Sequence, residues 1–541
     1  MQKKLSVLRA AIAHEFLSDN IDPDITNLCF DSREVKKNSL FFALPGTHVH
    51  GNEFISMAIS KGASAIVFQD ELPEEAKKAI SERKVQDGTE VAFVKVENSR
   101  FAMSPIAAVF YDDPSSKMGI IGVTGTEGKS STVAFVWQLL RLCGKKAGFI
   151  STVQYSVGEK AIANPEHQTT PEAPIIQRQL YEMLQNGCQF AVVESSSHGL
   201  STKTNRLGNV KFDAALWMNV THEHLEFHGT VEQYKSDKAN LFRSLDKISH
   251  KKIVNGKEHI FTPFGVINAE DPSAEYFANA TKSKVFSFST FGKAGHSEIQ
   301  SNCVLPAKVT QFECHDLNAT EKGISFFMHE KNLEESKFSV NAYLPGAFNA
   351  YNVMAAIITV SEITGIPKKE VAKYTTALEP IKGRMTQVDC GQPFEVIVDY
   401  AHTPSSFETI FPPLRKRAKG KIIVVFGSGG ERDTKKRPIQ GRIAAIWCDT
   451  VILADEDPRG EDPVELLEMI AKGARQEGKN ESNGLYIIPD RKKAILQAFH
   501  LAQPGDIVLL LGKAHENSII YKDYVMPYDE ISTAKELLDS M

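Results

Sequence analysis

Short apolar runs alternate with amphipathic stretches along most of the chain, and we expect this pattern to fold as sheets crossed by helices. Up to residue 113, the runs 39–44, 65–69 and 90–96 predict strands, and residues 52–61 predict a helix. Residues 112–116 then favour a linker, because Asp, Pro and Ser favour turns. The pattern predicts a first domain of residues 1–113.

A second block opens at residues 118–123, an apolar run that leads through a glycine-rich turn into a predicted helix at 129–142. Two more apolar runs, 190–193 and 214–220, predict strands that end in polar residues. From 262 to 344 the sequence is richer in β-branched and polar residues, and we interpret it as the rest of this sheet with surface hairpins. A helix at 349–364 follows, so residues 114–382 are predicted to form a parallel sheet with helical crossovers.

The third block, residues 383–541, repeats the alternation. Its predicted strands, with helices between them, are 395–398, 421–426, 450–453 and 506–511. Polar motifs follow these strands, and open doubly wound sheets bind ligands at the carboxyl ends of their strands. We therefore predict an α/β protein with three domains, 1–113, 114–382 and 383–541.

Composition agrees with this division and removes several function classes. The 541 residues favour roughly two to four domains, and 42% hydrophobic with 24% charged residues is ordinary for globular proteins. The net charge of −5, with no Lys/Arg stripe, argues against a nucleic-acid partner. No apolar run reaches the ~18 residues that span a bilayer, and we see no signal peptide. We expect a cytoplasmic protein without membrane insertion.

The segment GVTGTEGKS at 122–130 lies between a predicted strand and a predicted helix, as a phosphate-binding loop does. Its glycines allow backbone N–H groups to face phosphate oxygens, and the helix N-terminus adds a favourable dipole. Lys129 would offset phosphate charge, and Ser130 would bind magnesium. The general pattern GxxxxGK[ST] is met imperfectly, because its first glycine falls on Val123.

Two strand-end motifs point to the same phosphate site. ESSSHG at 194–199 and THEHLEFH at 221–228 offer carboxylate and imidazole groups that would hold a second divalent ion. A single histidine is as readily a core or solvated residue, but three within seven positions favour a site. Lys238, on a predicted helix at 231–242, is an ordinary surface lysine by composition alone.

Four further motifs follow strands of the third block: DYAHTP at 399–404, GSGGERD at 427–433, DEDPR at 455–459 and GKAHE at 512–516. Glycine-rich loops with Arg, His and carboxylates suit a zwitterionic small molecule, since Arg binds its carboxylate and Asp or Glu its ammonium. Each could be a solvated turn, but four on one sheet edge favour a binding site.

Together these motifs resemble the Mur ligase family, in particular its MurE type, over essentially the whole chain. The family's shorter loop, TGTxGK[ST], matches residues 124–130 without strain. The resemblance implies a UDP-sugar-binding N-terminal domain, a central P-loop ATPase domain with a parallel sheet, and a C-terminal Rossmann-like domain. It also implies ligation of a diamino acid to the D-Glu γ-carboxylate of UDP-N-acetylmuramoyl-L-Ala-D-Glu (UDP-MurNAc-L-Ala-D-Glu), through an acyl phosphate, by a monomer.

The resemblance carries ATP-binding and metal-binding roles to matching positions. The ATP contacts it implies are Gly122, Thr124, Gly125, Thr126, Glu127, Gly128, Lys129, Ser130, Ser131, Asn349, Asn352, Arg384 and Asp399. Two Mg²⁺ are implied, with Ser130, Glu194, His224 and Lys238 as ligands, and Lys238 carbamylated by CO2. The implied catalytic residues are Lys129, Glu194, His224 and Lys238. A carbamate turns a cation into an anionic oxygen ligand, which Mg²⁺ prefers.

It also carries over the two other substrate sites. The implied contacts to UDP-MurNAc-dipeptide are Phe30, Ser32, Thr47, His48, Val49, Thr169, Thr170, Ser196 and Arg206, and which residue of 201–204 fills the family's Gln position stays open. The implied amino-acid contacts are Arg432, Glu456, Asp457, Pro458, Arg459, Gly512 and Glu516.

The sequence departs from the family pattern at two of these positions. The family's DNPR and GKGHE motifs read EDPR and GKAHE here, with Asp457 for Asn and Ala514 for Gly. DNPR accompanies meso-diaminopimelate, whereas an added acid at Asp457 would favour lysine or ornithine, so the amino acid stays open. Another ligase of the superfamily and a non-catalytic nucleotide-binding regulator are the alternative functions.

Overall fold

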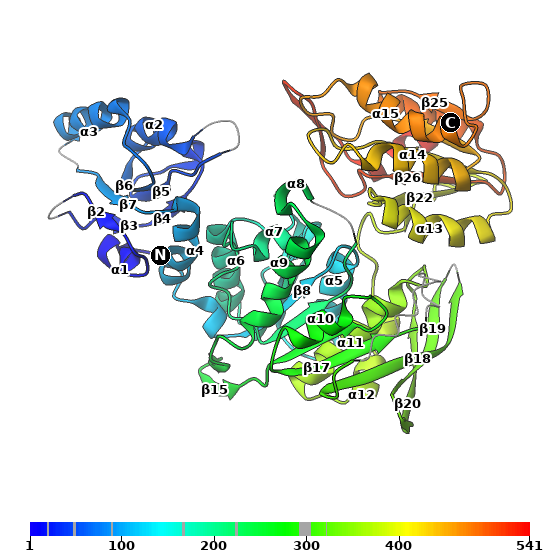
Figure 1. Cartoon of the computed structure of the whole chain (residues 1–541), viewed down its shortest axis with the longest axis horizontal. Coiled ribbons are helices and arrows are strands. Elements are labelled where there is room, and N and C mark those ends of the chain that lie inside the picture. The colour runs from blue at the N-terminus through cyan, green and yellow to red at the C-terminus, as the bar shows by residue number, and fades with distance from the viewer. Residues whose placement is uncertain are drawn as a thin grey trace.

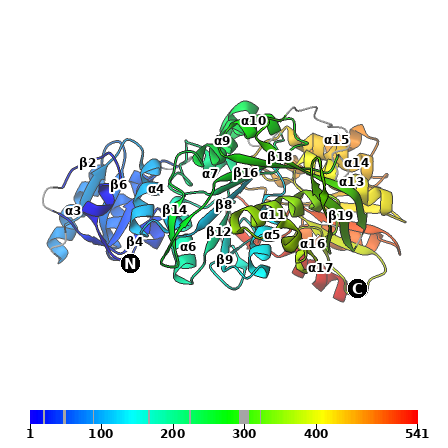
Figure 2. The same ribbon diagram turned by 90° about the horizontal axis from the view of Figure 1, so that it is seen from below.

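The computed structural model describes the chain except for residues 19–20, 47–49, 88–89, 165–167, 222–224, 292–304 and 321. Its described residues build three main sheets of five, eleven and six strands, in chain order. The N-terminal and C-terminal sheets lie on either side of the central one (Figures 1 and 2). Among the described helices, none has the length and apolar character that crossing a bilayer requires.

The N-terminal sheet has the order β2-β7-β6-β5-β4, with β4 to β7 parallel. Its strands are β2 (Glu15–Phe16), β4 (Asn27–Cys29), β5 (Ser39–Phe42), β6 (Ala63–Phe68) and β7 (Ala92–Lys95). The helices around it are α1 (Leu5–Arg9), α2 (Ile55–Ser60), α3 (Glu74–Asp87) and α4 (Ser99–Phe110). The three predicted strands are confirmed, and the predicted helix at 52–61 begins as a 3-10 turn, Gly51–Phe54, before α2.

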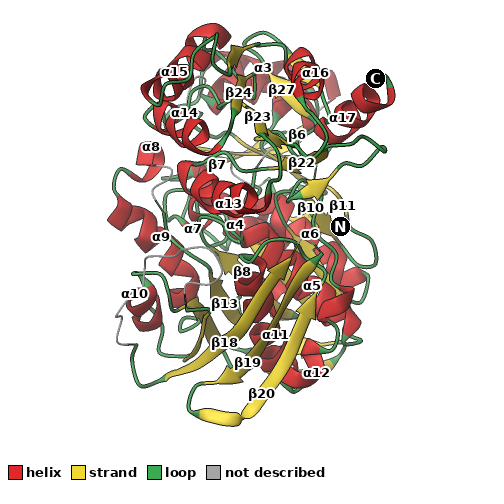
Figure 3. Ribbon diagram, turned by 90° about the vertical axis from the view of Figure 1, so that its right-hand side faces the viewer, coloured by secondary structure: helices red, strands yellow, loops and turns green. Residues whose placement is uncertain are grey.

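The central sheet has the order β11-β10-β9-β12-β8-β13-β16-β17-β18-β19-β20. Its parallel strands are β9 (Ala147–Ile150), β12 (Phe190–Glu194), β8 (Gly119–Thr124), β13 (Ala214–Trp217), β16 (Phe264–Asn268), β17 (Lys284–Ser289) and β18 (Val309–Thr320). Antiparallel strands extend both edges: β10 (Gln154–Ser156), β11 (Ile162–Ala163), β19 (Gly323–Glu330) and β20 (Leu333–Ala342). The sheet and hairpins predicted between 262 and 344 are thus confirmed, and β18 to β20 stand out as long strands in Figure 3.

Helices cover both faces of this sheet. One apolar core joins the sheet to α5 (Lys129–Leu142) and α11 (Asn349–Thr364), both at their predicted bounds. A second core joins the other face to α6 (Ala173–Gln185), α9 (Val231–Ser244) and α10 (Ala274–Asn279). The short helices α7 (Ser197–Leu200), α8 (Leu225–His228) and α12 (Lys368–Ala372) complete the domain. Burial on both faces explains why the central strands β8, β12, β13 and β16 are buried along their whole length and mostly apolar.

The C-terminal sheet has the order β21-β22-β26-β23-β24-β25, parallel except for β21. The strands are β21 (Thr386–Gln387), β22 (Glu395–Asp399), β23 (Ile422–Phe426), β24 (Thr450–Leu453), β25 (Leu485–Ile487) and β26 (Ile507–Leu511). One face packs on α13 (Pro404–Arg417), α14 (Lys436–Trp447) and α15 (Pro463–Gln476), the other on α16 (Arg491–Leu501) and α17 (Glu530–Asp539). The predicted doubly wound arrangement is confirmed.

Candidate active site

The glycine-rich loop joins β8 to α5 and takes a shape that its glycines permit. Gly128 has a φ of 79°, in the left-handed region that glycine adopts without strain. A Cβ at this position would lie 2.9 Å from Oδ1 of Asn352, on α11. Asn352 in turn accepts a hydrogen bond from Thr132 and donates one to Asn349, at 3.1 and 3.0 Å. Asn352 therefore lies against the loop, and Asn349, the other asparagine predicted to contact ATP, lies beside it.

A residue that the sequence did not single out fixes the loop from its other side. Asn219 follows β13, and its Oδ1 accepts the backbone N–H groups of Thr126 and Glu127 at 2.9 and 2.8 Å. Lys129 begins α5, and its Nζ donates to the carbonyl of Thr126 at 2.7 Å. The lysine thus lies folded onto the loop whose bound phosphate it is predicted to contact.

Gly122 has a packing role that the loop motif did not predict. It lies inside buried β8, and a Cβ there would come within 2.4 Å of Cδ1 of Leu241 on α9. Glycine therefore lets α9, the helix that carries Lys238, approach the sheet closely. Ser131, in contrast, lies in the first turn of α5 beside Ser130, where the motif placed it.

Glu194, at the end of β12, accepts hydrogen bonds from the first turn of α5 and from the residues that follow β9. Its buried carboxylate accepts from the hydroxyl of Ser130 at 3.1 Å and from the N–H and hydroxyl of Thr152, both at 3.0 Å. Ser151 donates to it as well. A carboxylate and a hydroxyl 3.1 Å apart form an oxygen-rich donor set, which suits Mg²⁺ better than a softer metal.

Lys238 is buried, with only 1% of its surface exposed, so the surface role suggested by composition is wrong. Its Nζ donates to the carbonyl of Gly125 at 2.7 Å and lies 4.4 Å from the ring centre of Tyr234. Thr126 and Tyr234 join their hydroxyls at 3.1 Å. A carbamylated nitrogen keeps one N–H, so the hydrogen bond to the loop is compatible with the predicted carbamate. The predicted ligand His224 lies outside the described residues.

His228 links the Glu194 loop to the Lys238 helix. Its Nε2 lies 3.0 Å from the hydroxyl of Ser197, three residues after Glu194, and its Nδ1 lies 2.8 Å from Asp237, the residue before Lys238. The serine, histidine and aspartate are all buried, so the serine is not presented to a substrate as a nucleophile. The arrangement instead makes His228 a positioning residue, which periodicity alone could not distinguish from its neighbours.

His228→Ala is expected to lower kcat about 10- to 100-fold, because misplacing a reacting group by about 1 Å costs this much. It should also raise the Mg²⁺ concentration needed for half-maximal rate, which a purely structural loss would leave unchanged. His228→Gln, whose amide can donate and accept, should recover part of the rate. The assay is ADP release across a Mg²⁺ titration, with circular dichroism to confirm folding and exposed His259→Ala as control. Full activity at ordinary Mg²⁺ in a folded His228→Ala protein would rule this role out.

The predicted dipeptide contacts gather beside Glu194. The Thr170 hydroxyl donates to the backbone carbonyl of Glu194 and accepts the N–H of Ser196, both at 2.9 Å. Arg206 donates to the carbonyl of Thr170 at 2.9 Å and to Glu172 at 2.9 Å. Thr169 precedes this cluster and is partly exposed. The structure thus brings these predicted residues together at the carboxyl end of β12.

The remaining predicted contacts to UDP-MurNAc-dipeptide belong to residues 1–113. Phe30 packs on the core of that domain, and the Ser32 hydroxyl donates to Sδ of Met57 at 3.4 Å. Thr47, His48 and Val49 are not among the described residues. Arg100 on α4 joins this domain to the dipeptide cluster, because it pairs with Glu172 at 2.7 Å.

The C-terminal domain meets the phosphate-binding loop directly. Glu127 accepts hydrogen bonds from the hydroxyls of Thr403 and Ser405, at 3.1 and 2.7 Å. Arg384 lies 3.5 Å from the Ser130 hydroxyl. Thr403 and Ser405 lie at the start of α13, and Arg384 lies in the segment that enters the C-terminal domain. Helix α13 lies on the side of this domain that faces the central domain (Figures 1 and 3).

Asp399 acts on the backbone around Arg384. Its carboxylate accepts the N–H groups of Met385 and Ala401 at 2.7 and 2.8 Å. Burial raises the pKa of Asp399, and the nearby charge of Arg384 opposes this rise. The two predicted C-terminal ATP contacts therefore lie close together, with the aspartate fixing the turn that presents the arginine.

Asp457, the acid that departs from the family pattern, is paired inside the protein. Its Oδ1 accepts from Nζ of Lys513 and from the N–H of Ile520, both at 2.9 Å. Lys513 is almost fully buried and also pairs with Glu516, whose pKa is raised by burial. Asp457 is thus held by hydrogen bonds inside the protein, and Lys513 is shared between Asp457 and Glu516.

Glu456 and Arg459 keep unsatisfied atoms that a zwitterion would satisfy. Within the described residues, Oε2 of Glu456 and Nε of Arg459 are buried and lack a hydrogen-bond partner. Gly512 approaches this carboxylate so closely that a Cβ would lie 2.6 Å from Oε2 of Glu456. Arg459 also lines a cleft of about 410 Å³ with Tyr521 and Tyr524. Pro458 lies between Glu456 and Arg459 in the same loop and is buried, while Arg432 is exposed.

Comparison with known proteins gives consistent matches along the chain. Three family models match it: Mur ligase family, catalytic domain, at residues 24–111; Mur ligase middle domain, at 123–360; and Mur ligase, glutamate ligase domain, at 383–514. The UDP-N-acetylmuramyl-tripeptide synthetase of Treponema denticola is 52% identical over 511 residues, which cover 94% of this chain and 90% of that relative.

Two more distant relatives have a named amino acid. The UDP-N-acetylmuramoyl-L-alanyl-D-glutamate--2,6-diaminopimelate ligase of Geobacillus kaustophilus is 35% identical over 515 residues, 95% of each chain. A solved structure of a UDP-N-acetylmuramoyl-L-alanyl-D-glutamate--2,6-diaminopimelate ligase has a TM-score of 0.59 at 25% identity, covering 100% of this chain and 99% of that one. The predicted α/β class and three-domain architecture are confirmed by these matches.

Proposed function

Because the chain belongs to the Mur ligase family, we propose that this ATP-dependent ligase joins a diamino acid to the D-Glu γ-carboxylate of UDP-MurNAc-L-Ala-D-Glu. One observation carries the proposal: Ser130 of the phosphate-binding loop contacts both Glu194, beside the dipeptide cluster, and Arg384 of the C-terminal domain. The phosphate-binding loop, the carboxylate beside the acceptor cluster and the ATP contact of the C-terminal domain therefore converge on Ser130. We propose the domain boundaries 1–113, 114–382 and 383–541, and a cytoplasmic monomer.

The chemistry takes place in two steps. The γ-carboxylate oxygen attacks the γ-phosphorus of ATP, and the bond from that phosphorus to the β-phosphate oxygen breaks. ADP departs, and the D-Glu side chain becomes an acyl phosphate. The amine then attacks the acyl carbon, loses a proton, and expels inorganic phosphate from the tetrahedral intermediate. Lys129 leaves the carbonyl of Thr126 to offset charge on the phosphoryl oxygens. Closure of the C-terminal domain through Thr403 and Ser405 excludes water, which would hydrolyse the acyl phosphate.

Ser130 and Glu194, with the proposed ligands His224 and carbamylated Lys238, would hold two Mg²⁺. When bound, these ions supply positive charge that stabilises the transferring phosphoryl group. The oxygen donors of Ser130 and Glu194 fit such ions, and the buried position of Lys238 beside the loop fits a modified lysine.

We propose meso-diaminopimelate, L-lysine or L-ornithine as the amino acid. Glu456 would accept a hydrogen bond from the ammonium group, and Arg459 would bind a carboxylate. Asp457 is 7% exposed and already pairs with Lys513, so we do not assign it as a direct partner of the far ammonium group of lysine or ornithine. We propose that the side chains lining the cleft beside Arg459 select the amino acid by their contacts with the far end of its side chain.

Purified protein should release ADP only when UDP-MurNAc-L-Ala-D-Glu and the correct diamino acid are both present. The three amino acids are tested in parallel, with products identified by mass spectrometry. A tripeptide product from one of them supports the proposal. ADP release with a different acceptor would favour another ligase of the superfamily, and ATP binding without turnover would favour a regulator.

A further inference from the structure

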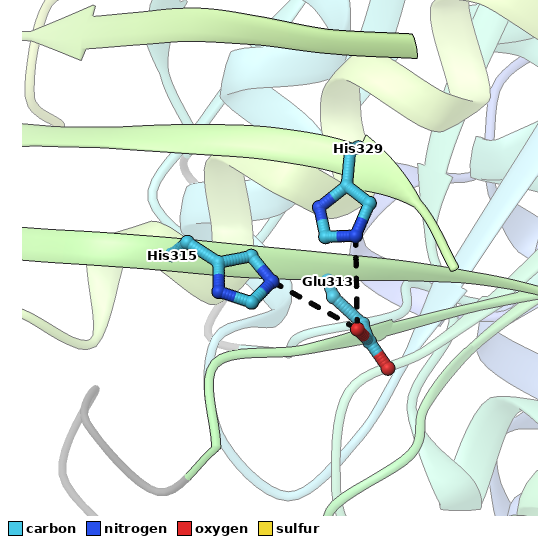
Figure 4. Close-up of side chains that lie close together, drawn as sticks. All are labelled: Glu313, His315 and His329. Carbon is cyan, nitrogen blue, oxygen red and sulfur yellow. Dashed lines mark ion pairs between the residues drawn. The ribbon is translucent and has the colours of Figure 1, made fainter. Parts of the chain in front are cut away.

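A cluster of ligand-type side chains lies on the antiparallel extension of the central sheet, on strands that take no part in the site described above. Glu313 and His315 are two residues apart on β18, so their side chains share one face of the sheet. His329 on β19 pairs directly opposite Glu313 in the ladder and therefore projects from that same face. Figure 4 shows the two imidazoles turned toward the carboxylate.

The distances between these groups leave space for an ion. Oε2 of Glu313 lies 3.8 Å from Nε2 of His315 and 3.8 Å from Nε2 of His329. Ligand atoms of the three residues all fall within 4.8 Å of one another. Zinc–ligand bonds of about 2.1 Å place two donor atoms about 3.4 Å apart at a tetrahedral angle, so the cluster needs only small side-chain shifts.

Within the described residues, two nitrogen atoms of the cluster are buried without a hydrogen-bond partner. Over the described part of the chain, neither imidazole and no oxygen of the Glu313 side chain makes a hydrogen bond. Nδ1 of His329 and Nε2 of His315 are both buried, and the His329 side chain is only 7% exposed. Buried polar groups are usually hydrogen-bonded, so two buried imidazole nitrogens without a partner, in a cluster with a carboxylate, call for a ligand.

Lys331 is a charged neighbour that would compete with a metal ion for the Glu313 carboxylate. Its Nζ lies 3.6 Å from Oε1 of Glu313, on the oxygen that faces away from the histidines. The lysine side chain is 45% exposed and also donates to Gln311, so it can move into solvent without leaving a buried charge. Oε2 of Glu313 stays available to a metal.

We propose that Glu313, His315 and His329 bind a divalent transition metal, with zinc as the best fit, that joins β18 to β19. Two imidazoles and one carboxylate are a common zinc donor set, and a fourth position remains for water. Imidazole nitrogen disfavours Mg²⁺, which prefers oxygen, so this site would be chemically distinct from the proposed magnesium site at Glu194.

The test compares Zn²⁺ binding by metal-free full-length protein and two double variants. We expect the wild type to bind Zn²⁺ with micromolar or tighter affinity and the His315→Ala/His329→Ala protein to lose this event. The matched control, His259→Ala/His500→Ala, removes two exposed histidines elsewhere and should bind as the wild type does. Glu313→Gln, which keeps the size of the side chain, should weaken binding at least 10-fold and serves if the double variant does not fold.

Cobalt gives a second measurement that separates this site from the cysteines. Co²⁺ at Glu313, His315 and His329 should show tetrahedral d–d absorption without a thiolate charge-transfer band, and excess Mg²⁺ should not displace it. Equal Zn²⁺ affinity and stoichiometry in the wild type and in the variants of these three residues would overturn the proposal. So would a cobalt spectrum with thiolate bands only. Neither outcome depends on ligase activity, so failure here leaves the proposed function untouched.

Discussion

Lys129→Ala is expected to abolish ADP release. The side chain begins α5 at the end of the glycine-rich loop, and its Nζ already lies 2.7 Å from the Thr126 carbonyl. The substitution would remove the positive charge at the end of the loop that we expect to offset the negative charge on the transferring phosphoryl oxygens. Removing a charged group that stabilises such a transition state typically costs about 10³-fold or more in rate.

The experiment measures substrate-dependent ADP release for Lys129→Ala, Lys129→Arg and an exposed control, Lys160→Ala. We expect Lys129→Arg to recover little activity, because the planar guanidinium does not match a point charge on a short loop. Lys160→Ala should retain the wild-type rate. Unchanged turnover in folded Lys129→Ala protein would contradict the proposed reaction.

Local features of the fold were predictable from the sequence. The bounds of α5 and α11 match their predictions, and the apolar strands β8, β12 and β23 were found within about one residue. Hydrophobic periodicity and a strand–loop–helix motif extend over a few neighbouring residues, so both can be recognised in the sequence without knowledge of the fold. The loop itself was found by the same local signal.

Contacts between distant segments could not be predicted in this way. Asn219 holds Thr126 across 93 residues of sequence, because β13 pairs with β8 although the chain visits β9 and β12 between them. Asp457 stood out in the sequence only as an added acid, and its partner Lys513 comes 56 residues later. Spacing along the chain reveals neither strand order nor the burial of a lysine.

The resemblance supplied what local patterns could not at Lys238. Composition placed this residue on the surface, whereas the family pattern assigned it a carbamate and a metal. The structure buries it between the loop carbonyl of Gly125 and the ring of Tyr234. Burial agrees with a functional lysine, but the carbamate remains a prediction that needs its own experiment.

Lys238→Ala is therefore expected to reduce ligase activity by about 10³-fold, comparable to losing a main electrostatic group of the site. The matched control is Lys235→Ala on the same helix, whose ammonium lies 4.7 Å from the ring centre of Tyr276. This control removes one lysine from α9 without touching the loop, so it should stay close to wild-type activity. A similar loss in both variants would indicate damage to the helix and not to the site.

Added short-chain carboxylates distinguish a carbamate from a plain ammonium group. If Lys238 supplies an anionic oxygen ligand, formate or acetate entering the space left by Lys238→Ala should restore part of the ADP release, whereas methylammonium should not. If the residue acts as a cation that holds the carbonyl of Gly125, the amine should rescue and the carboxylates should fail. Loss of activity without carboxylate rescue would count against the carbamate, and the loop contact would then be the role that the structure supports.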